Sequence, residues 1–437
     1  MADGYNEEKK EGTQGEGEEE KKFSFLQEKI KEKRSFDWRK ELQKVYFTVF
    51  LAVVFGVVAG YVFVVAVPYI QQRVNPEEPS PVVIDQDDEM QQAGEEEAPD
   101  EAPEADPVII QEKVSVELED YASLFNKMSV LAAECSRGLV TVTCATSETD
   151  WFNNLMENQH HGTGAIVADN GLELLVLTER KLLEDAERIS VTFADGTIAD
   201  AALKAYDGNT GLAVLSIEKR GLSEETRNAL EIVELGNSNL VTKGAPIIAA
   251  GSPLEYENAA VFGNITSQSN YKRTSDANYK ILTTDILGSV NGTGVLLNMK
   301  GEVIGIISQD IGEGDSSSTV MAYAISDIKG IIEKLSNGED IAYMGIRGMD
   351  VTAEISEAAG MPQGVYVEVE MDSPAMAAGI QNGDVITAIN NEPIVNMKAI
   401  QNIMLEFEPE QALNVQLMRL GKDGYVEMKY VVTLGKL

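Results

Sequence analysis

The chain has 437 residues, enough for two or three domains of ordinary size. Its hydrophobic fraction of 43% is that of globular proteins, but its formal net charge is -37 at pH 7. A chain of this sign repels phosphate backbones, so we expect no nucleic-acid partner. Much of the acidity lies in the first twenty positions and in residues 76–112, which indicates charged tails more than charged folded surface.

A long apolar segment is the first structural signal along the chain. Residues 45–67 contain no charged side chain and reach the roughly 20 residues that span a bilayer core. The segment is too long, and lies too far behind a charged N-terminal region, for a cleaved signal peptide. Basic residues are frequent from Lys29 to Lys44, whereas only Arg73 follows the segment closely. The sequence therefore predicts a single-pass protein of the cell membrane with a cytoplasmic N-terminus, typical of a bacterial envelope.

The segments on both sides of this helix are polar. Residues 1–44 form the expected cytoplasmic tail, whose first part has too few apolar side chains to offset the entropy of an ordered chain. Residues 68–112 are rich in Pro, Glu, Asp and Ala, and we expect an acidic flexible linker that extends by self-repulsion. The two cysteines, Cys135 and Cys144, follow this linker. A disulfide is permitted outside the cytoplasm, but two free buried thiols fit the sequence equally well.

Residues 113–338 change to short strands of alternating or wholly apolar character, separated by Gly, Asn and Asp turns. Examples are GLVTVTCAT, LELLVLT, RISVTFADGT and APIIAAG. Many short strands at this spacing predict a barrel or a sandwich, so we expect a mostly β fold. The pattern alone does not decide between these two architectures.

Five segments of this region, in order, resemble the HtrA family of trypsin-fold serine proteases. GTGAIVADNG is similar to the family's G-S-G-x-I segment, and DGNTGLAVLSIE is similar to D-x-x-T-D-L-A-V-L-x-I. The segment TTDILGSVNGTGVLLNMKGEVIGI is similar to the family's nucleophile segment, and the remaining two are LTERKLLEDAERISVTFADG and LVTKGAPIIAAGSPLEYENAAVFGNITS. The resemblance implies two six-stranded chymotrypsin-like barrels and a homotrimer.

The residues at the family's catalytic positions are substituted. The chemistry of such a site uses a serine hydroxyl, a histidine that takes its proton and an aspartate that fixes the histidine tautomer. The resemblance places Lys181 at the histidine position and Gly211 at the aspartate position. The serine position falls on Thr293 or on Gly292, depending on the end from which the segment is counted. No catalytic residue is intact, which favours an inactive protein but leaves enzyme activity open.

Other arrangements of reactive groups can also be drawn from the sequence. Lys181 could act as a base for Thr293, but a lysine with the ordinary pKa of about 10.4 is protonated at neutral pH, and the charged segment around it does not desolvate it. Ser289 becomes a candidate nucleophile if the loop folds differently. The two histidines, His160 and His161, lie in the polar segment ENQHHG, where we expect solvated loop side chains. The sequence implies no metal and no cofactor, since a zinc site would lack further ligands.

Residues 339–437 resemble a PDZ domain, an α+β fold, in the arrangement of bacterial HtrA proteins. Two motifs carry the resemblance, YMGIRG at Tyr343 and SPAMAAGIQNGDVITAINNEPI at Ser373. Asp384, within the second motif, is expected to serve as a turn residue.

Five residues of this domain are predicted to bind a peptide. In Met344, Gly345 and Ile346, a glycine between two apolar residues lets main-chain amides turn toward a carboxylate. Ile400 and Met404 share a face of the following helix and are expected to line the groove, although plain core packing explains them almost as well. A bound peptide would add a strand, and its apolar C-terminal residue would fill a pocket.

The sequence therefore predicts a membrane-anchored extracytoplasmic HtrA-like protein. Its expected partners are unfolded proteins or polypeptide C-termini, bound through the PDZ domain in envelope quality control or as a signalling scaffold. The favoured hypothesis is a pseudoprotease. The alternative is an active serine-type endopeptidase with a rearranged site that uses Thr293 or Ser289.

Overall fold

A computed structural model describes residues 46–54, 56, 61, 79–87, 117–149, 155–308, 311 and 318–436. Within the predicted membrane segment, residues 46–54 are helical and exposed. None of the helices in this described part of the chain is long and apolar enough to cross a membrane. The transmembrane helix therefore stays a prediction, and the predicted cytoplasmic tail lies outside the described residues.

The first barrel forms because apolar side chains alternate along its strands. On β1 (Leu139–Thr149), Val140, Val142 and Cys144 are buried and share one core cluster with the neighbouring strands. This period of two directs one face of each strand into the barrel. The other strands are β2 (Leu155–Asp169), β3 (Glu173–Glu179), β4 (Arg188–Thr192), β5 (Ile198–Tyr206) and β6 (Leu212–Glu218). They close in the order β1-β2-β3-β6-β5-β4.

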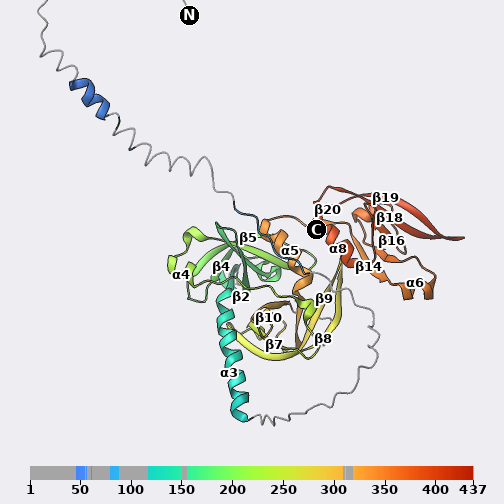
Figure 1. The fold of residues 1–437 in the computed structure, drawn as a ribbon, viewed down its shortest axis with the longest axis horizontal. Helices are drawn as coiled ribbons and strands as arrows, with labels where there is room; N and C mark the ends of the chain where they lie inside the picture. Colours follow the sequence, from blue (N-terminus) through green and yellow to red (C-terminus); the bar gives the residue numbers. More distant parts are fainter. Residues whose placement is uncertain are drawn as a thin grey trace, which may run out of the picture. The chain divides into compact units, whose positions relative to one another are not determined.

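The second barrel has its own six strands and its own core. They are β7 (Pro246–Ser252), β8 (Ala259–Thr274), β9 (Ala277–Leu287), β10 (Thr293–Leu297), β11 (Val303–Ile307) and β12 (Thr319–Ala324). The strands close in the order β10-β11-β12-β9-β8-β7. Strands β8 and β9 are the longest hairpin of this barrel and appear in yellow in Figure 1. The expected fold of two six-stranded barrels is confirmed.

Helices connect and flank the barrels. Helix α3 (Leu118–Cys135), the long teal helix of Figure 1, leads into β1 through the 3-10 turn η2 (Ser136–Gly138). Helix α4 (Glu224–Ala229) follows β6, and helix α5 (Ile325–Asn337) directly follows β12. The cysteines at the end of α3 and on β1 are free, and burial raises the pKa of the Cys144 thiol to about 11.

Residues 79–87 lie against α5 and are not a free spacer. Val82 is buried in the same core cluster as Ile328 and Ile331 of the helix. The carboxylate of Asp87 lies 2.9 Å from the ammonium of Lys329, and both side chains are largely buried. This differs from the flexible linker expected for residues 68–112, most of which lie outside the described residues.

The C-terminal domain is a sheet with helices packed on it. Its main sheet runs in the order β14-β15-β16-β18-β19, with β17 paired to β16, and a two-stranded sheet joins β13 to β20. The strands are β13 (Ala342–Tyr343), β14 (Ile346–Val351), β15 (Gly364–Val369), β16 (Val385–Ile389), β17 (Glu392–Pro393), β18 (Ala412–Gly421), β19 (Gly424–Thr433) and β20 (Gly435–Lys436). The helices are α6 (Ala353–Ala359), α7 (Pro374–Ala378) and α8 (Met397–Glu406).

A buried ion pair closes this domain at Asp384. The side chain of Asp384 is 1% exposed, and Arg419 donates to its two oxygens from Nε and Nη2, each at 2.7 Å. The carboxylate also accepts the main-chain N–H of Gln381 at 2.9 Å, which is the turn contact expected from the sequence. The same side chain therefore fixes a turn and a strand.

We predict that Asp384→Ala lowers the free energy of unfolding by about 3 kcal/mol, because Arg419 loses its buried partner. Urea unfolding of the C-terminal domain measures this change. Asp423→Ala is the matched control, since Asp423 is exposed at the turn between β18 and β19, and it should change the free energy by less than about 0.5 kcal/mol. Equal effects of the two substitutions would contradict the prediction.

Candidate functional site

The predicted histidine and aspartate positions lie next to each other in the first barrel. Lys181 is exposed in the 3-10 turn η3 (Arg180–Leu183), which follows β3. The main-chain N–H of Arg180 donates to the carbonyl of Gly211 at 2.7 Å. Gly211 has φ +70 and carries no side chain that could orient a base. The two positions are therefore brought together by the backbone, without the side chains that proton transfer requires.

A carboxylate close to this turn serves the fold. Asp207 is 2% exposed and accepts hydrogen bonds from the N–H of Thr210 at 2.9 Å and from its hydroxyl at 2.5 Å. Burial raises the pKa of Asp207, and these hydrogen bonds from Thr210 lower it. The carboxylate closes the turn that ends at Gly211 and does not reach toward a nucleophile.

The two positions proposed for the nucleophile are both blocked, each in its own way. A Cβ built on Gly292 would stand 2.4 Å from the carbonyl oxygen of Pro253, so a serine there requires the loop to move. Thr293 is 2% exposed, and its Oγ1 accepts the main-chain N–H of Thr163 at 2.8 Å. This hydrogen bond joins the first strand residue of β10 in the second barrel to β2 in the first.

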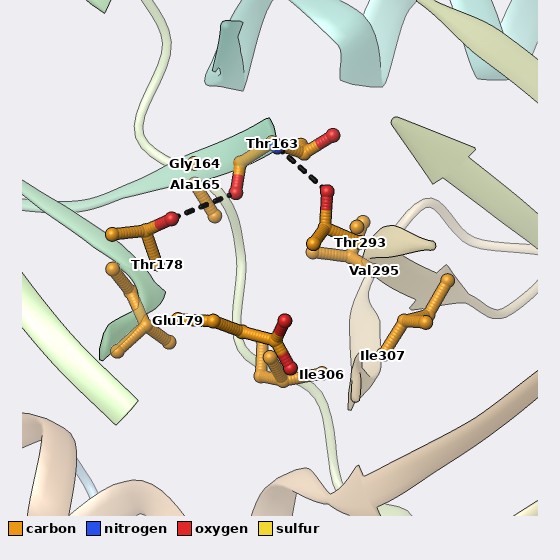
Figure 2. Close-up of a pocket in the computed structure, with 11 residues that line it drawn as sticks. Thr163, Gly164, Ala165, Thr178, Glu179, Thr293, Val295, Ile306 and Ile307 are labelled. Carbon is orange, nitrogen blue, oxygen red and sulfur yellow. Dashed lines mark hydrogen bonds between the residues drawn. The ribbon is translucent and has the colours of Figure 1, made fainter. Parts of the chain in front are cut away.

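The space around Thr293 is small (Figure 2). The cavity beside it holds about 10 Å³ and is lined by the main chain and side chains of β2, β3, β10 and β11. The hydroxyl of Thr178 closes one side by donating to the carbonyl of Thr163 at 3.1 Å. A cavity of this size accommodates about one water molecule. Because Thr293 is only 2% exposed, its side chain is not open to a peptide carbonyl in this conformation.

The hydroxyl of Ser289 has a carboxylate as its hydrogen-bond partner, but this carboxylate is not an effective general base. The hydroxyl donates to Oε1 of Glu255, which also accepts from Nδ2 of Asn291 at 3.1 Å. The hydrogen bond from Ser289 holds the pKa of Glu255 below its usual range. A carboxylate of lowered pKa is a weak proton acceptor, so this arrangement does not activate the serine.

The two histidines lie on strand β2 and not in a loop as expected, and both are exposed. Nδ1 of His161 is 3.1 Å from Oγ1 of Thr143 on the neighbouring strand. The same nitrogen is 3.7 Å from Oε1 of Glu257, which belongs to the second barrel. A relay needs the hydroxyl and the carboxylate on opposite ring nitrogens. Here both partners face Nδ1, and the ring is 42% exposed, so the contact lacks the geometry of a triad.

The predicted peptide-binding residues come together in the core of the C-terminal domain. Met344, Ile346 and Ile400 are fully buried, Met404 is 3% exposed, and all four belong to one cluster. Gly345 has φ +85, and a Cβ there would stand 2.3 Å from that of Ser373. The backbone shape predicted for a carboxylate-binding loop is present, whereas the four apolar side chains pack as core.

A residue that the sequence reasoning missed occupies this loop. Asp276, at the turn between β8 and β9, is 4% exposed and accepts the main-chain N–H groups of Met344, Gly345 and Ile346 at 2.7 to 3.0 Å. Burial raises the pKa of Asp276 to about 6 against the opposing effect of these hydrogen bonds. The turn dipeptide in TSDA gave no sign of this role, because its partners are remote in sequence.

No group of three or more His, Cys, Asp or Glu side chains that could hold a metal ion occurs among the described residues. The two closed barrels and the sheet domain with its loop at Gly345 define a trypsin-like double barrel followed by a PDZ-like domain. Residues 162–306 match the family model of the trypsin-like peptidase domain, and residues 365–412 match that of the PDZ domain.

Curated relatives and solved structures agree with this assignment. The chain is 26% identical to the serine protease Do-like HtrA of Lactobacillus helveticus over 63% of this chain and 69% of that one. It is 29% identical to a DegP-like periplasmic serine endoprotease of Ectopseudomonas mendocina over 64% of this chain, but the match spans only 57% of that relative. The structure of the HtrA-type protease AlgW with decapeptide superposes with a TM-score of 0.52 at 20% identity, covering 71% of this chain and 98% of that one. The chain therefore has a trypsin-like peptidase domain followed by a PDZ domain, and over both it is similar to HtrA- and DegP-type serine proteases.

We predict that Thr293→Val lowers the free energy of unfolding by about 1 to 3 kcal/mol, because the partly buried N–H of Thr163 loses its acceptor while the side-chain volume is kept. Thr293→Ser keeps the hydroxyl and should lower the free energy of unfolding by less than Thr293→Val does. Chemical denaturation of the three proteins measures the difference. A destabilisation by serine as large as that by valine would show that the hydroxyl is not what matters at this position.

Proposed function

We propose that this protein is a peptide-binding member of the HtrA type whose double barrel no longer performs serine-protease chemistry. The main support is the environment of Thr293. Its hydroxyl is buried, already accepts a main-chain N–H, and adjoins a cavity for about one water molecule. A nucleophile must be reached by the scissile carbonyl and must have a base within hydrogen-bond range, and Thr293 meets neither condition.

Two main-chain N–H groups in the turn before Thr293 are engaged by main-chain carbonyls. In trypsin-like chemistry, main-chain N–H groups beside the nucleophile bind the oxygen on which charge develops. The N–H of Gly292 instead donates to the carbonyl of Ser289 at 2.9 Å, and the N–H of Ser289 donates to the carbonyl of Pro253 at 3.0 Å. This loop is closed on itself, which supports loss of the reaction together with loss of the triad.

An active endopeptidase with a rearranged site is the second candidate. One observation favours it, the contact between the ring of His161 and the hydroxyl of Thr143 at 3.1 Å. If the ring turned so that Nε2 faced the hydroxyl, Glu257 could hold Nδ1 and a threonine nucleophile would result. The residue pair is at the surface, so a substrate could approach it.

We expect the full chain, in detergent micelles, to be neither labelled by a fluorophosphonate probe nor able to digest casein, with trypsin as the positive control. Three variants locate any activity that appears: Thr143→Ala, Ser289→Ala and Thr293→Ala. Labelling that disappears in one of them identifies the nucleophile and refutes the loss of protease chemistry.

Peptide binding is tested with the same preparation. A pool of fluorescein-labelled hexapeptides, random at the last three positions, is compared with the same pool amidated at its C-terminus by fluorescence anisotropy. Because the loop at Gly345 presents main-chain N–H groups to a carboxylate, amidation should abolish binding. Equal binding of both pools would exclude capture of a C-terminal carboxylate.

The membrane anchor and the bacterial envelope location are part of the proposal and rest on the apolar run of residues 45–67. The full chain should stay with membranes after alkaline carbonate washing, whereas a chain that begins at Pro79 should be released. Protease added to intact cells should cut the double barrel and spare the N-terminal tail. Release of the full chain by carbonate would overturn the anchor. The homotrimer implied by family resemblance stays a prediction, which sedimentation of the same two chains would check.

A further inference from the structure

The carboxylate-binding loop of the PDZ domain already holds a carboxylate. Oδ2 of Asp276 accepts the N–H of Met344 at 2.7 Å, and Oδ1 accepts the N–H of Ile346 at 3.0 Å. The N–H of Gly345 lies 3.0 Å from both oxygens. Hydrogen bonds to an ionised acceptor are stronger than neutral ones, and here both oxygens are engaged. The three donors that a peptide C-terminus would use are occupied.

The main chain of Asp276 also resembles that of a bound C-terminal residue. Its main-chain N–H donates to the carbonyl of Ile346, the first residue of β14, at 2.7 Å. A terminal residue that extends the sheet at β14 offers the same two features, a carboxylate and an N–H directed at the strand. Two residues further on, Nδ2 of Asn278 donates to the carbonyl of Gly348 at 3.3 Å. The β8–β9 hairpin thus follows the edge that a ligand would follow.

The hairpin tip is held from both sides. Nδ2 of Asn209, in the turn that ends at Gly211, donates to the carbonyl of Ser275 at 2.8 Å. On the PDZ side, Tyr343 and Arg347 both hold Glu370, at 2.9 and 2.8 Å, close to Asp276. Asp276 has φ +60, a conformation that suits the turn and is tolerated by Asp, Asn and Gly. Asp276 is therefore one of the points at which the double barrel contacts the PDZ domain, together with Asn278.

Beyond Asn278, part of the groove is open. A cavity of about 350 Å³ lies between the hairpin, β14 and the start of α8, with Lys280, Met349 and Lys398 among its lining residues. Oδ1 of Asn278, at its wall, is buried without a hydrogen-bond partner. Upstream residues of a peptide would have room here, but its terminal carboxylate would not.

We propose that Asp276 is an internal ligand that keeps the PDZ carboxylate site closed, and that a polypeptide with a free C-terminal carboxylate binds only when the β8–β9 hairpin withdraws. This inference rests on the proposed peptide-binding function. Because the competitor belongs to the same chain, it acts at a high effective concentration. The apparent Kd for an external peptide is therefore the intrinsic Kd divided by the fraction of molecules with an open site.

Substitution of Asp276 in the full chain tests the proposal. Asp276→Gly removes the carboxylate and keeps the positive φ, and Asp276→Asn keeps the shape of the side chain and removes its charge. With the free-carboxylate hexapeptide pool, both variants should bind at least about tenfold more tightly than the unchanged chain. Asp423→Ala, a charge-matched change at an exposed turn, should bind like the unchanged chain. Identical Kd values for all four proteins would overturn the internal ligand while leaving peptide binding intact.

Hydrogen exchange separates this inference from the proposed function if no pool binds to any variant. In that case peptide capture is refuted, and the amides of residues 343–348 decide the remaining question. Faster exchange of this segment in Asp276→Gly than in Asp423→Ala shows that the carboxylate occupies the loop. Unchanged exchange shows that it does not, and the proposal of an internal ligand then fails as well.

Discussion

A buried main-chain N–H group must have an acceptor, and the two sites of this protein are both governed by how that requirement is met. At the double barrel, the N–H of Thr163 is satisfied by the hydroxyl of Thr293. At the PDZ loop, the N–H groups of Met344, Gly345 and Ile346 are satisfied by Asp276. In each case the acceptor is a side chain of the second barrel. Groups that a substrate or ligand would need are therefore used to hold the protein together.

The contacts that hold the two barrels together do not depend on protease chemistry. Thr293 joins β10 to β2, and Asp207 closes the turn at Gly211 through Thr210. Both interactions stabilise the barrels whether or not a substrate binds. Selection for the platform alone would keep such residues, and it would also keep Gly211, whose φ of +70 suits glycine.

The sequence was sufficient for the architecture and insufficient for the contacts. Alternating strands and turn residues predicted a β fold, and the collinear motifs predicted two barrels followed by a PDZ domain, because both signals are local. Gly345 was also found from its local pattern, since a glycine between two apolar residues indicates the loop. The partner of that loop is 69 positions away, and the partner of Lys329 is 242 positions away. A short stretch of sequence carries no information about contacts between residues so far apart in the chain.

The burial of Asp276 sets what an external ligand must provide. Desolvation raises the pKa of its carboxyl to about 6, so at neutral pH the group is still ionised but is held in a less favourable environment than water. The C-terminal carboxylate of a peptide in the same loop would lose the same hydration and accept from the same three N–H groups. The last residue of the peptide therefore binds no more strongly than Asp276. The advantage of the peptide must come from upstream residues in the open cavity beside Met349 and Lys398, where the hairpin leaves space. Specificity would therefore be decided in that part of the groove, away from the carboxylate.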